Sequence, residues 1–176
     1  MTASKKTSGA SADNAITMLT DDHKKVKKLF KDFEKVKEKG DASEKEALVE
    51  QICTELTIHA EIEEEMFYPA AREVIEDDDL MNEAEVEHAS AKDLIEQIQA
   101  MDSSDPTYDA KVTVLGEYVN HHIEEEEKEM FPKVKKAKLD LEAMGEEIAT
   151  LKQTKETQLM GGAGKSSRSS GTSARL

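Results

Sequence analysis

The sequence predicts an all-α protein, an up-down four-helix bundle built from two similar helical hairpins, with a short C-terminal helix and disordered tails. Charged residues make up 36% of the chain and aromatic residues 4%, so the β-branched and aromatic runs that strands need are absent. Apolar residues recur at alternating steps of three and four, as on the buried face of a bundle helix. An eleven-residue motif also occurs twice, 63 residues apart.

Residues 1–13 form a polar lead that we expect to be disordered, and residues 14–135 form the bundle. The first helix is predicted to begin at Asn14 as N-cap and to end near Gly40. Ser43 and Glu46 resemble a capping box at the start of the second helix, and Pro69 is expected to kink or end it. The apolar faces of these two helices comprise Ile16, Leu19, His23, Val26, Phe30 and Phe33, then Val49, Ile52, Leu56, His59, Glu63 and Met66.

The second hairpin follows an acidic connection at residues 76–79. Asp105 is a candidate N-cap for the fourth helix, with Pro106 at its first position, and this helix should end by Pro132. The apolar faces of the third and fourth helices comprise Met81, Ala84, His88, Ala91, Ile95 and Ile98, then Val112, Leu115, Val119, His122 and Glu126. Residues 136–160 contain a shorter fifth helix, from Leu139 to about Gln158, which should pack on the outside or at one end. The Gly/Ser/Arg-rich residues 161–176 are predicted to be a disordered tail.

The repeated motif reads His59-Ala-Glu-Ile-Glu63-Glu-Glu-Met-Phe-Tyr-Pro69 and His122-Ile-Glu-Glu-Glu126-Glu-Lys-Glu-Met-Phe-Pro132. Each copy has Glu at positions +2, +4 and +5 from the histidine and Pro at +10. On a helix, residues four apart share one face, so each His and its +4 Glu can reach a common cation. The helices that precede the two motifs carry His23 and His88, each directly after an acidic residue, which completes the similarity of the two hairpins.

The formal net charge of −15 indicates which partners to expect. Both tails are basic, so the bundle is more acidic still, and such a field repels nucleic acid and anionic membranes and attracts cations. Cys53 is the single cysteine, which excludes an intrachain disulfide and a cysteine metal cluster. No apolar run approaches membrane-spanning length, and the first residues lack a signal-peptide core. We therefore expect a soluble, cytoplasmic protein without nucleic-acid or membrane partners.

Histidine and glutamate on the apolar faces indicate a metal site. A single histidine there is usually an ordinary hydrogen-bonded core residue, but four on four helices, two with a buried Glu at +4, are not explained in that way. Imidazoles with carboxylates suit Fe, Mn or Zn and suit Ca²⁺ poorly. Six ligands exceed one tetrahedral zinc and divide between two ions bridged by Glu63 and Glu126, with a solvent oxide or hydroxide, although a single Fe or Zn stays open. The candidate ligands are His23, His59, Glu63, His88, His122 and Glu126.

The order H…HxxxE…H…HxxxE, with Phe-Pro or Tyr-Pro after each HxxxE, resembles the hemerythrin-like (HHE cation-binding) family over about residues 14–135. This resemblance implies a four-helix bundle holding two non-haem iron ions, rather than zinc or manganese, on the six residues above. Oxygen-carrying hemerythrins have a further histidine on the third helix, where this chain has Ala84. Glu85, Tyr118 or water could take its place, and the alternative for Tyr118 is a hydrogen-bonded core residue. His121 should lie at the surface or behind the ligands, and Glu64 and Glu127 could orient the histidines.

The expected function is binding of, or reaction with, a small ligand such as O₂, peroxide or nitric oxide, in stress response or sensing. As an enzyme, the protein would be a catalase- or peroxidase-like oxidoreductase; no general base or organic-substrate pocket is identifiable. The alternative is non-catalytic iron binding for storage, buffering or iron sensing. A third hypothesis is a purely structural bundle, which predicts that loss of His59 or Glu126 leaves stability unchanged or raised.

Overall fold

The computed structural model describes residues 14–39 and 41–163. Every regular element in this part of the chain is helical, which confirms the predicted fold class. The elements are α1 (Ala15–Lys39), α2 (Ala42–Ile62), η1 (Glu63–Phe67), α3 (Tyr68–Val74), α4 (Asp78–Gln99), α5 (Tyr108–Glu125), η2 (Glu126–Met130), α6 (Phe131–Lys136) and α7 (Leu141–Ala163), where η1 and η2 are π-helical.

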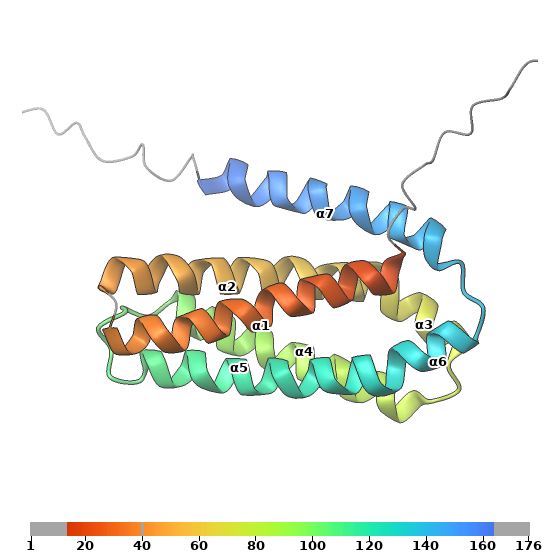
Figure 1. Cartoon of the computed structure of the whole chain (residues 1–176), viewed down its shortest axis with the longest axis horizontal. Helices are drawn as coiled ribbons and strands as arrows, with labels where there is room; N and C mark the ends of the chain where they lie inside the picture. The colour runs from red at the N-terminus through yellow and green to blue at the C-terminus, as the bar shows by residue number, and fades with distance from the viewer. Residues whose placement is uncertain (1–13, 40, 164–176) are drawn as a thin grey trace, which may run out of the picture.

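The four long helices α1, α2, α4 and α5 lie side by side, and α3 and α6 prolong the bundle at one end (Figure 1). Apolar side chains form two buried clusters, one at each end of the bundle. Along α1, Leu19 belongs to one cluster and Val26 to the other, and His23 lies between them. On α2 and α4 the histidine likewise lies between residues of the two clusters, and after α5 it is Glu126 that separates Ile123 of one cluster from Met130 of the other. The polar side chains therefore form a layer between two apolar clusters.

The prolines of the two repeated motifs, Pro69 and Pro132, lie inside continuous helical segments rather than at helix ends. A π-helical turn precedes each proline: Tyr68 N–H donates to Glu63 O, and Phe131 N–H donates to Glu126 O. The wider i→i−5 turn accommodates one extra residue without breaking the helix. The expectation that the fourth helix ends by Pro132 was therefore wrong, since α6 continues to Lys136.

Helix starts partly follow the predictions. Thr17 N–H donates to Asn14 Oδ1 at 3.0 Å, which confirms that cap, and α1 ends at Lys39, one residue before Gly40, which lies outside the described residues. The second helix begins with Asp41 as N-cap, its Oδ1 accepting from Glu44 N–H at 2.8 Å, so the predicted capping box was wrong. Likewise α5 begins at Tyr108, later than the start predicted from Asp105 and Pro106.

Helix α7 is 23 residues long and was wrongly predicted to be short. It lies along the outside of the bundle across α1 and α2 (Figure 1). Ile148 enters the apolar cluster nearest to it, while Lys152 pairs with Asp22 of α1 and Lys155 lies 2.7 Å from both Glu61 and Glu65. The predicted tail from residue 161 is helical as far as Ala163; the rest of it, and the lead at 1–13, lie outside the described residues.

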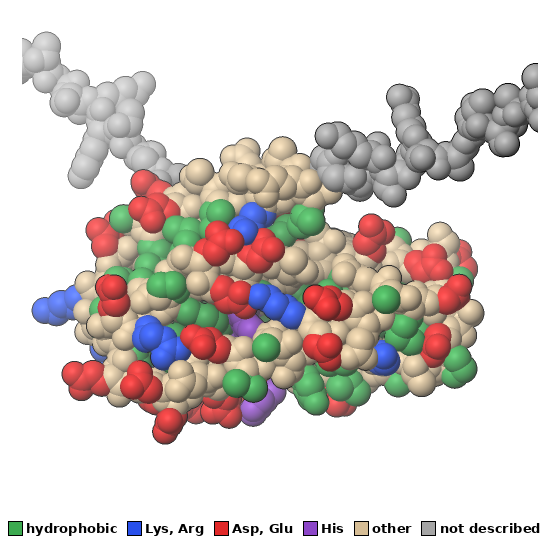
Figure 2. All heavy atoms as spheres, turned by 180° about the vertical axis from the view of Figure 1, so that it is seen from behind, with side chains coloured by type: hydrophobic (Ala, Val, Ile, Leu, Met, Phe, Trp, Pro, Cys, Tyr) green, Lys and Arg blue, Asp and Glu red, His purple; other side chains and the backbone are tan. Residues whose placement is uncertain are grey.

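The surface of the bundle is predominantly acidic. Figure 2 shows red acidic side chains spread over the face seen from behind, with lysines among them and histidine coming to the surface. Within the described ranges, we find no helix with the length and apolar character needed to cross a lipid bilayer.

Candidate metal centre

Four buried side chains form the first group of possible ligands. His23 comes from α1, His59 from α2, and Glu63 and Glu126 are the first residues of η1 and η2; one donor atom of each lies within 4.8 Å of the others. His23 Nε2 lies 3.2 Å from His59 Nε2 and 3.2 Å from Glu126 Oε2. His59 Nε2 lies 3.2 Å from Glu63 Oε1. Two imidazoles and two carboxylates therefore face one another in the layer between the apolar clusters.

A second group lies on the other side of the same two carboxylates. It consists of His88 from α4 and His122 from α5, whose Nε2 atoms are 3.0 Å apart, together with Glu63. Glu63 Oε2 lies 3.3 Å from His88 Nε2, and Glu126 Oε2 lies 3.6 Å from His122 Nε2. Each carboxylate thus reaches one histidine of each group, the arrangement expected of two residues that bridge two cations.

The glutamates at +5 of each motif contact histidines of the opposite hairpin. Glu64 Oε1 accepts from His88 Nδ1 at 3.0 Å, and Glu127 Oε1 accepts from His23 Nδ1 at 2.9 Å. The expectation that Glu64 and Glu127 orient histidines is confirmed, because a carboxylate acceptor places the imidazole proton on Nδ1 and turns the Nε2 lone pair inward.

The acids that precede His23 and His88 face the other two histidines, a role that sequence reasoning missed. Glu87 Oε2 accepts from His122 Nδ1 at 2.7 Å. Asp22 Oδ2 lies 3.8 Å from His59 Nδ1, too far for a hydrogen bond, and its other oxygen pairs with Lys152 of α7. The repeat of an acid before each first-helix histidine was the available signal.

Tyr68 is the second functional candidate that sequence reasoning missed. Its hydroxyl lies 2.9 Å from Glu126 Oε1, 3.0 Å from His88 Nε2 and 3.2 Å from His122 Nε2. The corresponding residue of the second motif is Phe131, which stacks on the His23 ring at 5.7 Å between centroids. One hydroxyl therefore distinguishes the two otherwise similar groups.

The electrostatics of the cluster favour positive charge. Burial opposes protonation of His59, but the charge of Glu63 and the neighbouring Asp22 raise its pKa to about 10. Burial likewise opposes protonation of His122, while Glu126 and Glu87 raise its pKa to about 9. Burial by itself would raise the pKa of Glu63, yet His59 and His88 hold it well below its ordinary value. The Glu63 carboxylate is therefore ionised, and its surroundings favour cationic charge.

Comparison with known proteins places this arrangement in a family. The family model described as the hemerythrin HHE cation binding domain matches residues 14–134. The chain belongs to this family. A solved hemerythrin HHE cation binding domain-containing protein of Mycobacterium kansasii has the same fold, with a TM-score of 0.73 and 24% identity over 89% of this chain and 95% of that one.

A curated relative in Nostoc sp., named a DNA nickase, is 33% identical over 114 residues. This match covers 65% of the present chain and 31% of the relative, so the chain spans about a third of that protein's length.

The HHE-domain residues of this chain fit a bound cation pair. His88 and His122 each donate Nδ1–H to a carboxylate, which directs their Nε2 atoms, 3.0 Å apart, toward the buried carboxylates, where a cation can be shared. Glu63 Oε1 and Glu126 Oε2 are buried and make no well-aligned hydrogen bond among the described residues, although His59 Nε2 and His23 Nε2 lie 3.2 Å from them. A buried carboxylate oxygen without a partner is costly, and ligation removes that cost.

Among the described residues, neither of the two candidates for the place of the missing histidine forms a hydrogen bond or ion pair with the six proposed ligands. Glu85 is exposed and pairs with Arg72 at 2.7 Å, while Ala84 is buried. Tyr118 is 50% exposed, so the core role suggested for it is wrong, while its place in the lining of the cavity at the histidines leaves the ligand role a prediction. The hydroxyl of Tyr68, from the other hairpin, lies beside His88 and His122 instead. His121 lies at the surface, which was one of the two locations predicted for it.

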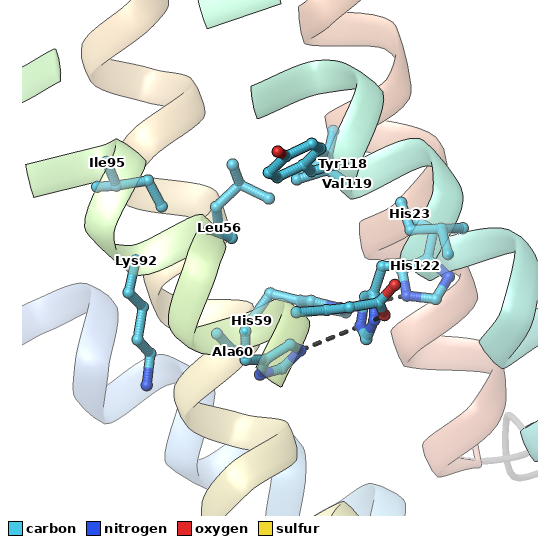
Figure 3. Close-up of a pocket in the computed structure, with 14 residues that line it drawn as sticks. His23, Leu56, His59, Ala60, Lys92, Ile95, Tyr118, Val119 and His122 are labelled. Carbon is cyan, nitrogen blue, oxygen red and sulfur yellow. Dashed lines mark hydrogen bonds and ion pairs between the residues drawn. The ribbon is translucent and has the colours of Figure 1, made fainter. Parts of the chain in front are cut away.

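A small cavity of about 40 Å³ reaches the histidines from the side of α4 and α5. Figure 3 shows the imidazoles of His59 and His122 together with Leu56 and Val119, which line the same cavity. Seven of its fourteen lining residues are apolar, and the other seven are the four histidines with Glu87, Lys92 and Tyr118. This volume accommodates a few atoms, comparable with a few water molecules.

Proposed function

We propose that this chain is a non-haem di-iron protein that binds or reacts with O₂, peroxide or nitric oxide. The observation that carries the proposal is the convergence of four imidazole Nε2 atoms on two buried carboxylates that each reach both histidine pairs. This nitrogen and oxygen donor set, without thiolate, suits iron. Iron bound there would supply reversible redox change and an attachment point for a small ligand.

The cavity supports a small ligand rather than an organic substrate. Its volume of about 40 Å³ admits a diatomic molecule or peroxide, whereas drug-sized ligands occupy several hundred Å³. Apolar neighbours such as Leu56 and Val119 exclude bulk water from the Nε2 atoms. Tyr68 places one hydroxyl beside His88 and His122, where it can ligate a cation or hold a proton near a bound ligand.

The name of the Nostoc relative is not a basis for assigning DNA cleavage to this chain. The match covers 31% of that protein, and the formal charge of −15 disfavours contact with a phosphate backbone. The acidic surface instead favours a second function of the same site, iron binding for storage, buffering or sensing.

The proposal is tested by metal analysis and optical spectroscopy on protein purified without chelators. We expect about two irons per chain and a charge-transfer absorption that changes on addition of hydrogen peroxide. Glu126→Gln should lose most of the iron, because it removes a shared negative ligand, whereas Glu124→Gln, at an exposed site on the same helix, should retain it. A single zinc, or no metal, with a featureless spectrum would overturn the di-iron assignment.

Peroxide consumption separates the two functions. A reactive centre predicts oxygen release or substrate oxidation in proportion to bound iron, lost in the Glu126→Gln variant. Iron that binds and leaves without peroxide turnover would favour storage or sensing.

A further inference from the structure

A second cluster of metal-ligating side chains lies on the outer surface of α4 and α5. His121 Nε2 lies 3.4 Å from Glu125 Oε1 and 3.6 Å from Glu87 Oε1, and one donor atom of each residue lies within 4.8 Å of the other two. The His121 side chain is 62% exposed, while those of Glu87 and Glu125 are 20% and 26% exposed. The donors are therefore open to solvent but held on two packed helices.

The spacing of His121 and Glu125 repeats that of the buried pair His122 and Glu126, one residue earlier on the same helix. Adjacent helical residues point about 100° apart, so this second HxxxE pair faces outward. The same positions in the first hairpin are Ile58 and Ile62, which are buried in the cluster that α7 packs against. The second hairpin thus replaces two covered isoleucines by a histidine and a glutamate at an uncovered position.

The two carboxylates of this cluster pair with the imidazoles of His121 and His122. Among the described residues, no lysine or arginine forms an ion pair with Glu87 or Glu125. A partly desolvated pair of carboxylates beside an imidazole attracts a divalent transition-metal ion, for which the two donor types are suitable ligands.

Glu87 connects this surface cluster to the buried centre. Its Oε1 atom faces His121, and its Oε2 atom accepts from Nδ1 of His122, whose Nε2 atom faces the buried carboxylates. Glu87 also lines the cavity that reaches the histidines. An ion held at the surface cluster would therefore lie at the entrance to the buried site.

We propose that His121, Glu125 and Glu87 form a surface site for a divalent transition-metal ion, and that this site supplies iron to the buried centre. The proposal that this site binds a metal ion rests on the geometry of the surface cluster alone. The supply role rests on the proposed di-iron function.

Binding is tested by titrating metal-loaded protein with Co²⁺ and measuring the bound ion by equilibrium dialysis and visible absorption. We expect wild type to bind one further Co²⁺ and His121→Ala and Glu125→Gln to weaken that binding about tenfold or more. The control is Glu124→Gln, which removes the same charge one residue away from Glu125. Because Glu124 pairs with Lys128 outside the cluster, this variant should change Co²⁺ affinity little. Equal Co²⁺ affinity in wild type and His121→Ala, or equal loss in Glu124→Gln and Glu125→Gln, would overturn the site.

The supply role is tested by the rate at which metal-free protein takes up Fe²⁺. His121→Ala should load more slowly than wild type and reach the same final iron content, because the buried ligands are intact. An unchanged rate would overturn the supply role. If wild type takes up no iron, the proposed function fails, and the Co²⁺ titration, then run on metal-free wild type and His121→Ala, still decides the surface site.

Discussion

Tyr68 and Phe131 occupy equivalent positions in the two hairpins, nine residues after His59 and His122, and only Tyr68 brings a hydroxyl to the cluster. Their rings each pack against the first-helix histidine of one hairpin, Tyr68 against His88 and Phe131 against His23. The two histidine groups are consequently unequal, and at the proposed centre we expect a ligand or proton to be handled differently on the two sides.

The substitution Tyr68→Phe should make the surroundings of the two histidine groups alike, because it removes the hydroxyl that distinguishes them. If the phenol oxygen ligates ferric iron, we expect a visible phenolate charge-transfer band in wild type that this variant abolishes, with the bundle retained because the ring is kept. Absorption and resonance Raman spectra of iron-loaded protein measure this. The matched control is Tyr108→Phe, a buried tyrosine in the other apolar cluster, which should leave the spectrum unchanged. Identical spectra for wild type and Tyr68→Phe would rule out phenolate ligation.

Metal removal should destabilise the bundle, because Glu63 and Glu126 then remain buried without a cation. A ligand present at a thousand times its Kd stabilises a fold by about 4 kcal/mol, which for a chain of this size corresponds to roughly 10 °C in Tm. Scanning calorimetry of iron-loaded and chelator-treated protein measures the difference. Equal Tm values would mean that the site contributes nothing to folding, as a purely structural bundle predicts.

The stability of the metal-free protein should fall as pH rises above neutrality. The folded-state pKa of His59 is raised from its ordinary 6.5 to about 10, so its contribution is fully present below about pH 6.5 and is lost as pH rises through about 10. Urea midpoints of metal-free protein across this range test the expectation. His59→Gln should flatten the dependence, and a midpoint that is constant in metal-free wild type would contradict it.

Lys152→Met should weaken the attachment of α7. The Lys152 and Asp22 side chains are 20% and 12% exposed, so loss of the lysine leaves a largely buried carboxylate unpaired, at a cost of about 1–3 kcal/mol. Chemical denaturation measures the change. In the control, Lys24→Met, the exposed pair with Asp21 is lost without measurable effect. If both variants unfolded at the same denaturant concentration, the α7 ion pair would not be a stabilising contact.

The four bundle helices and their buried faces followed from the apolar spacing. In a helix, the spacing of residues along the sequence determines which of them share a face. No tertiary information was therefore needed to place four histidines on the inner faces, namely His23, His59, His88 and His122. The π-helical turns did not follow, because a proline in a helical pattern was expected to kink or end the helix. Glu63 and Pro69 have the same separation in sequence as Glu126 and Pro132. This equal separation was the signal that the two segments share a local geometry.

The sequence by itself determined which side chains face inward and that the two hairpins are alike, because both properties depend on local spacing along a helix. Tertiary structure alone decided which acid contacts which histidine: Glu64 reaches His88, 24 residues away, and Glu127 reaches His23, 104 residues away. It also decided that α7 covers the first hairpin through Asp22 and Lys152, and leaves His121 on the second exposed. Such pairings depend on the offset and rotation between packed helices, which side-chain packing fixes and periodicity along one helix does not encode.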